Sequence, residues 1–168
     1  MKLWQLFLAA VCALVVWYAL AENLEKTRKG KTAFRVLSGL MAVLAVYGIF
    51  AYTVLNRNTR GMHQFVLVSQ NNHEFLRELF MNGLLFLPLG LALSVFLGEW
   101  TILVAFLIST GIEVWQFAAG TGLAQGTDVL MNTVGATIGT IPLWIIRSGK
   151  VGHLAHRKRR DINNKEKE

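Results

Sequence analysis

The stretch from Leu79 to Leu97, LFMNGLLFLPLGLALSVFL, carries no formal charge. Its length is close to the roughly 20 residues that a helix needs to cross a hydrocarbon core of about 30 Å. A segment that crosses this core should be a helix, because no water is there to satisfy an unpaired backbone group. Similar stretches occur at Leu3–Ala21, Val36–Leu55, Val129–Ile146 and, interrupted only by Glu113, Trp100–Ala119. The sequence therefore predicts an all-α, polytopic transmembrane helical bundle of about five spans.

The composition excludes a water-soluble domain of this size. Hydrophobic residues make up 54% of the 168 residues and charged residues only 16%, with a mean hydropathy of +0.44. Five apolar helices leave too little polar sequence to build a covering layer around them. The single cysteine, Cys12, lies within the first span, so no disulfide can form within one chain.

The basic residues predict how the chain is oriented. Most of them follow the first or the last span, as is typical of cytoplasmic anchors under the positive-inside rule. They are Lys26, Arg28, Lys29, Lys31 and Arg35 after the first span, and Arg147, Lys150, Arg157, Lys158, Arg159, Arg160, Lys165 and Lys167 after the last. An odd number of spans then places the N-terminus outside and the C-terminus in the cytoplasm. The net charge of +7 therefore indicates anchoring at the membrane, with no nucleic-acid partner.

The chain divides into four parts on this prediction. Residues 1–55 hold two transmembrane helices, 56–73 an extracellular loop, 74–146 a three-helix transmembrane core, and 147–168 a basic cytoplasmic tail, which we expect to be partly disordered. An alternative is that residues 1–21 form a cleaved signal peptide, since Ala19-Leu20-Ala21 has the small-x-small form. The uncleaved anchor is favoured, because the apolar run exceeds the usual h-region of about 7–15 residues.

Polar residues of the last three spans fall at one depth. When the helices alternate in direction, the start of the third, the end of the fourth and the start of the fifth all lie at the outer side. These positions hold Glu74, Arg77, Glu78 and Asn82, then Glu113 and Gln116, then Asp128 and Asn132. A carboxylate at membrane depth costs at least about 2.5 kcal/mol, so Glu113 and Asp128 should face each other, Arg77 or a water-filled cleft.

Two interpretations of this polar set remain open. In the structural one, Arg77 pairs with Glu113 or Asp128, and the amide side chains form interhelical hydrogen bonds. In the functional one, which we favour, the set lines a polar cleft that opens to the outer leaflet. Glu113 and Asp128 are then the candidate catalytic acid and base. Arg77 is suited to hold a phosphate, and Glu74, Asn82, Gln116 and Asn132 are the other candidate substrate-binding residues.

Other motifs favour structural roles. The glycine-rich segment Gly120–Thr127 predicts an outer loop, with Thr127 placed to cap the next helix, and lacks the spacing of a nucleotide-binding fingerprint. Gly135 and Gly139 predict close helix packing. His63 and His73 have no recognisable metal-ligand spacing, so we predict no metal site and no cofactor.

The second half of the chain, roughly Glu74 to Ile146, resembles the VanZ-like family of bacterial membrane proteins. The residues that carry the resemblance are Asn82-Gly83-Leu84-Leu85-Phe86-Leu87-Pro88-Leu89-Gly90, then Glu113-Val114-Trp115-Gln116, then Asp128-Val129-Leu130-Met131-Asn132-Thr133-Val134-Gly135-Ala136-Thr137-Ile138-Gly139. The family's polar positions fall on Asn82, Glu113, Gln116, Asp128 and Asn132. The family often has an arginine and a further acid in the loop before Asp128, and this chain has neither. If those groups matter to the family, this chain either differs from it or supplies the charge from Arg57, Arg60 or Arg77.

The resemblance implies a multi-pass protein of the bacterial plasma membrane, associated with the cell envelope. The name-giving member is linked to resistance to teicoplanin, a lipoglycopeptide antibiotic. Three functions stay open: binding of a lipoglycopeptide or a lipid-linked wall precursor, enzymatic modification of a lipid-phosphate or envelope glycolipid, and proton-coupled transport. The partners we expect are membrane lipids and that amphiphile, and a homo-oligomer is compatible with the sequence.

Overall fold

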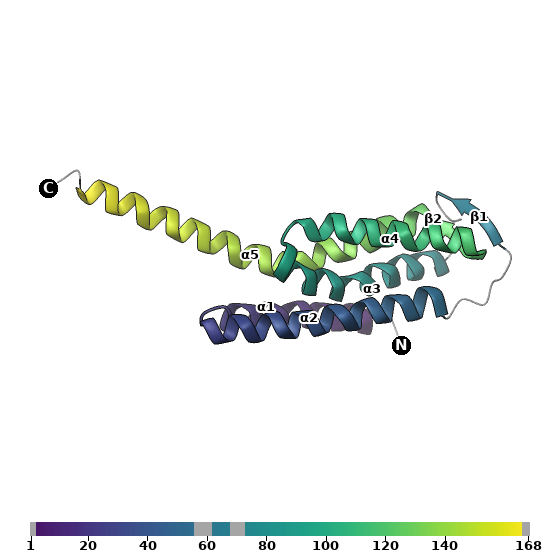
Figure 1. Cartoon of the computed structure of the whole chain (residues 1–168), viewed down its shortest axis with the longest axis horizontal. Helices are drawn as coiled ribbons and strands as arrows, with labels where there is room; N and C mark the ends of the chain where they lie inside the picture. Colours follow the sequence, from purple (N-terminus) through teal and green to yellow (C-terminus); the bar gives the residue numbers. More distant parts are fainter. Residues whose placement is uncertain (1–2, 56–61, 68–72, 166–168) are drawn as a thin grey trace.

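The computed structural model describes residues 3–55, 62–67 and 73–165 and places them in a bundle of helices with a short two-stranded ribbon at one end (Figure 1). The elements are α1 (Leu3–Leu24), α2 (Arg28–Phe50), a π-helical turn (Ala51–Leu55), β1 (Met62–Val66), α3 (His73–Leu97), α4 (Trp100–Ala119), β2 (Thr121–Gln125) and α5 (Gly126–Lys165). Five of these helices are long and apolar enough to cross a membrane. The predicted all-α bundle of five spans is therefore confirmed.

The surface of the bundle is apolar. Side chains such as Val15, Val43 and Leu107 are more than half exposed, although they lie in the middle of their helices. In water such a surface would be costly, because about 25 cal/mol is lost per Å² of apolar area exposed. Lipid tails remove this cost, so the surface is that of a membrane protein.

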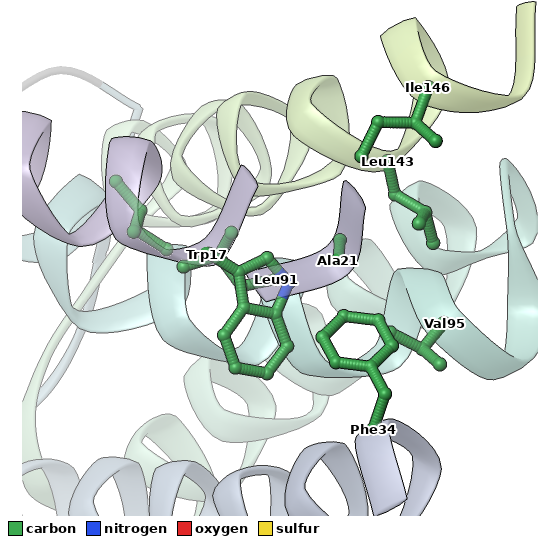
Figure 2. Packing of buried hydrophobic residues seen from close by; sticks show 8 residues of the cluster. Trp17, Ala21, Phe34, Leu91, Val95, Leu143 and Ile146 are labelled. Carbon is green, nitrogen blue, oxygen red and sulfur yellow. The ribbon is translucent and has the colours of Figure 1, made fainter. Parts of the chain in front are cut away.

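One hydrophobic cluster joins α1, α2, α3 and α5. Trp17 of α1 packs against Phe34 of α2, with ring centroids 5.1 Å apart and the ring planes tilted by 44°. Val95 of α3 and Leu143 of α5 complete the contact from the other side (Figure 2). The turn before α2 is fixed by Thr27, whose hydroxyl accepts a hydrogen bond from the backbone N–H of Gly30. The first two helices are thereby attached to the rest of the bundle.

Helices α3 and α5 cross at backbone contact, and glycines make this possible. A Cβ atom added at Gly139 would lie 2.5 Å from the carbonyl oxygen of Leu87 and 2.7 Å from the backbone nitrogen of Leu91. A Cβ at Gly90 would overlap Ala136, and one at Gly135 would overlap Gly83. The predicted packing role of Gly135 and Gly139 is confirmed, since no other residue fits there.

Short turns with left-handed glycines connect the last helices. Gly98 ends α3 with a φ of 58°, and Gly120 ends α4 with a φ of 60°. Glycine adopts this conformation without the steric cost of a Cβ atom. The turn at Gly98 and Glu99 makes α3 and α4 antiparallel neighbours, as their spacing in the sequence predicts.

Two short segments at one end of the bundle form a parallel two-stranded ribbon. Strand β1 pairs with β2, and Met62 lies opposite Thr121 and Val66 opposite Gln125. The glycine-rich segment is thus an extended strand that leads directly into α5. Thr127 does not cap α5, because the helix already begins at Gly126 and the buried hydroxyl of Thr127 has no hydrogen-bond partner.

Helix α5 continues well past the bundle. It runs to Lys165 and projects away from the other helices (Figure 1). The expectation that the tail is partly disordered is therefore wrong for residues 150–165, which extend the last transmembrane helix.

Candidate functional site

Four of the predicted polar side chains are buried at the ribbon end of the bundle. Glu113 and Gln116 lie in the last two turns of α4, and Asp128 and Asn132 lie in the first two turns of α5. Their exposed fractions are 6% and 0% in α4, and 7% and 4% in α5. The structure thus gathers four of the predicted site residues, and we call them the buried polar group.

Glu113 connects α4 to the ribbon. Its Oε2 accepts a hydrogen bond of 2.8 Å from the backbone N–H of Gln125, the last residue of β2. Ribbon and helix are therefore joined where the chain turns into α5. Two residues into that helix, Asp128 places its carboxylate in the first turn, where a negative charge interacts favourably with the helix dipole.

Asn132 connects α5 to α4. Its Nδ2 donates a 2.8 Å hydrogen bond to Oγ of Ser109, and its Oδ1 is buried without a hydrogen-bond partner. Oxygen and nitrogen of an amide are assigned from such contacts. If the amide is turned over, Ser109 donates to the oxygen and the nitrogen has no acceptor instead. In either orientation one polar atom of a buried side chain remains available.

Gln116 connects α4 to α2. Its Nε2 donates to the backbone carbonyl of Thr53 over 3.2 Å. Thr53 belongs to the π-helical turn that ends α2, where carbonyl groups lack the usual partner within the helix. The fully buried Gln116 side chain therefore gives a hydrogen-bond donor to a carbonyl group at a helix end inside the bundle.

The predicted residues of α3 are less involved. Asn82 is half-buried, whereas Arg77 and Glu78 are exposed. Glu74 lies in the first turn of α3, but its side chain is outside the described part of the chain, as are Arg57 and Arg60. Within the described residues, no ion pair joins Arg77 to Glu113 or Asp128. Its predicted role in holding a ligand stays a prediction.

The sequence did not identify three partners of the buried polar group. A serine in a helix commonly bonds back to its own backbone, and the signal that could identify Ser109 is its position one turn before Glu113 on the same face. The sequence could not identify the backbone N–H of Gln125 or the backbone carbonyl of Thr53 as partners, because almost every residue carries both groups.

The chemistry that the buried polar group offers is the acceptance of hydrogen bonds. Two carboxylates and two amides are buried at one end of the bundle, and bonds hold Glu113 to the ribbon, Gln116 to the end of α2 and Asn132 to α4. Carboxylates and amide oxygens accept hydrogen bonds from hydroxyl, amide and ammonium groups. The described residues hold no group of three histidine, cysteine, aspartate or glutamate side chains placed to bind a metal ion.

Comparison with known proteins gives one match. A family model described as VanZ/LLP1 matches residues 5–147. The match includes α1 and α2, which lie before the segment that carries the resemblance in the sequence. No curated protein and no solved structure matches the chain significantly.

Proposed function

Because the chain belongs to the VanZ/LLP1 family, we propose that this multi-pass membrane protein binds an amphiphile. The amphiphile is a lipoglycopeptide antibiotic or a lipid-linked envelope precursor of a bacterial plasma membrane. Binding at the ribbon end of the bundle changes how much antibiotic reaches its target, and so affects glycopeptide susceptibility.

The burial of two carboxylates at one end of the bundle carries this proposal. The bond from Gln125 needs only an acceptor, which a neutral glutamine would supply as well as Glu113 does. Burying a charged group costs several kcal/mol more than burying a neutral one, by order of magnitude. Glu113 and Asp128 nevertheless place two acidic groups, both buried, at this end of the bundle. Acidic groups at membrane depth are typical of functional sites, and they suit a ligand head group that donates hydrogen bonds.

A neighbouring apolar groove supports an amphiphilic ligand. The groove has a volume of 150 Å³ and lies between α1, α3 and α5. Its lining includes Gly83 and Met131, which adjoin Asn82 and Asn132 in the chain. Its wall is nearly all apolar, including Phe7, Leu14, Phe80, Leu87 and Ile138. Part of an acyl tail fits a groove of this size while the head group is held by the polar side chains.

The decisive experiment separates the charge of Glu113 from its hydrogen bond. Glu113→Gln keeps an acceptor for Gln125 but removes the charge, whereas Glu113→Ala removes both and leaves a buried N–H unsatisfied, at a cost of about 1–3 kcal/mol. Glu78→Gln is the matched control, since this carboxylate is exposed on α3. Each variant is expressed at equal level in a susceptible bacterium, and the inhibitory concentration of teicoplanin is measured.

We expect Glu113→Gln and Asp128→Asn to be folded but to lose the effect on susceptibility, and Glu78→Gln to keep it. Lipids that co-purify with the wild type should be lost from the same two variants in mass spectrometry. If both variants keep the effect and the lipids, the carboxylates are structural and the proposal fails. Conversion of a lipid-linked substrate by the purified protein would assign an enzyme instead.

A further inference from the structure

Two pockets lie at the end of the bundle opposite the ribbon, and Arg147 lines both. One has a volume of 380 Å³ between the last turn of α3 and α5. The other has a volume of 180 Å³ and reaches the start of α2. The turn between α1 and α2 lies at this end, and α5 leaves the bundle there (Figure 1). The positive-inside rule predicts that this end faces the cytoplasm.

Arg147 is held in place by the end of α3. Its guanidinium group donates to the carbonyl oxygens of Ser94, over 3.3 Å, and Val95, over 3.1 Å. These two bonds use two of the five N–H donors of the side chain. The group is therefore fixed between the two pockets and has further donors for a ligand.

The smaller pocket is cationic. Lys31 and Arg35 line it from one face of α2, Arg147 lines it from α5, and Glu25 is the only carboxylate among the described residues that line it. Phe34 and Val95, which pack in the hydrophobic cluster, also line it (Figure 2). The volume of 180 Å³ corresponds to roughly six waters at about 30 Å³ each, which is enough for a phosphate group.

The larger pocket has the features of a membrane interface. Leu143 and Trp144 form its apolar wall, and Trp144 is 57% exposed. Trp100, 70% exposed, begins α4 directly after the turn at this end. Exposed tryptophans are enriched where lipid tails meet head groups. A ligand that reaches both pockets therefore has an apolar part in the bilayer.

We infer that the two pockets together bind one anionic glycerophospholipid. Its phosphate lies between Arg147, Lys31 and Arg35, and its glycerol and upper acyl chains lie against Leu143 and Trp144. Basic pockets between membrane helices bind anionic lipid head groups in this way. The site is separate from the buried polar group, so neither proposal depends on the other.

The test measures lipid binding to the full chain in a neutral detergent. Thermal unfolding is followed while phosphatidylglycerol, phosphatidylcholine or inorganic phosphate is added. The variant Lys31→Gln/Arg35→Gln removes two cations without touching the bonds of Arg147. The control is Arg28→Gln/Lys29→Gln, which removes two cations from the same helix that do not line the pocket.

We expect phosphatidylglycerol to stabilise the wild type and phosphatidylcholine and phosphate to have little effect. The Lys31/Arg35 variant should bind phosphatidylglycerol more weakly by about fivefold per cation, the change that about 1 kcal/mol each produces. The Arg28/Lys29 control should bind as the wild type does. An equal loss in the control would show diffuse surface attraction, and equal binding of free phosphate would show a site for a soluble ion. Either result overturns the inference.

Discussion

Replacing Gly135 by alanine tests the crossing of α3 and α5 most directly. The new Cβ atom would overlap the carbonyl oxygen of Gly83 and lie 2.6 Å from its carbonyl carbon. Both contacts are with backbone, so no side chain can rotate away. The helices must separate by at least about 0.8 Å, the difference between 2.6 Å and ordinary contact at 3.4 Å, because the carbonyl oxygen is closer still.

The magnitude follows from this separation. A gap of 0.5–1 Å forfeits about a quarter to a half of the dispersion energy of the contacts that it opens. Overpacked substitutions typically cost about 1–3 kcal/mol, and we expect Gly135→Ala to fall in that range. For a chain of this size, about 2–4 °C of melting temperature is lost per kcal/mol.

Thermal unfolding of the detergent-solubilised protein measures the effect, and Gly111→Ala is the matched control. Gly111 lies in α4 with no atom within 4 Å of an added Cβ. Alanine there should stabilise the helix by up to about 1 kcal/mol, because glycine is a poor helix former. If the melting temperatures of the two variants move together, the close crossing does not exist as described.

Two further predictions concern the buried polar group and the orientation of the chain. Ser109→Ala and Asn132→Ala should be coupled by about 0.6 kcal/mol in a double-mutant cycle of unfolding, the average for hydrogen bonds between membrane helices, whereas additive effects would speak against the bond. In a Cys12→Ser background, Gln64→Cys should react with a membrane-impermeant maleimide in intact cells, and Ser148→Cys only after permeabilisation; the reverse pattern would refute an outward-facing ribbon.

The uncharged stretches predicted the spans well but not the helix ends. Helix α2 begins at Arg28, earlier than the uncharged stretch that starts at Val36, because Thr27 caps the helix in the polar turn. Hydropathy reports where a helix meets lipid, whereas capping and packing decide where it begins.

Depth in the membrane predicted which polar residues of α4 and α5 are buried. It did not predict which side of a wide helix face turns inward. On each helix the two polar residues lie on one narrow face, Glu113 and Gln116 on α4 and Asp128 and Asn132 on α5. When one residue of such a pair is buried, the other is buried as well. The polar set of α3 spreads over about 140° at 100° per residue, and among its described side chains Asn82 is half-buried whereas Arg77 and Glu78 are exposed. The spacing of polar residues along the sequence cannot show which edge of a wide helix face contacts a neighbouring helix.

The local sequence pattern did not predict the ribbon. Strand β2 has the sequence TGLAQ, which lacks the alternation that predicts a strand and has Thr121 as its single β-branched residue. Its extended shape follows from pairing with β1 and from the bond between Gln125 and Glu113. Contacts between distant segments determine this structure, and a single sequence carries little signal for them.

The pairing of β1 with β2 also sets an order of events during biosynthesis. Residues 67–120 separate the strands and include two complete membrane crossings, α3 and α4. At about 5–20 residues per second, the ribosome needs roughly 3 to 11 s to make that segment. During this interval β1 has crossed the membrane or waits at its surface with an unpaired edge. The ribbon closes only when the returning helix delivers β2 to the same side, so ribbon formation would report that both crossings have been inserted correctly.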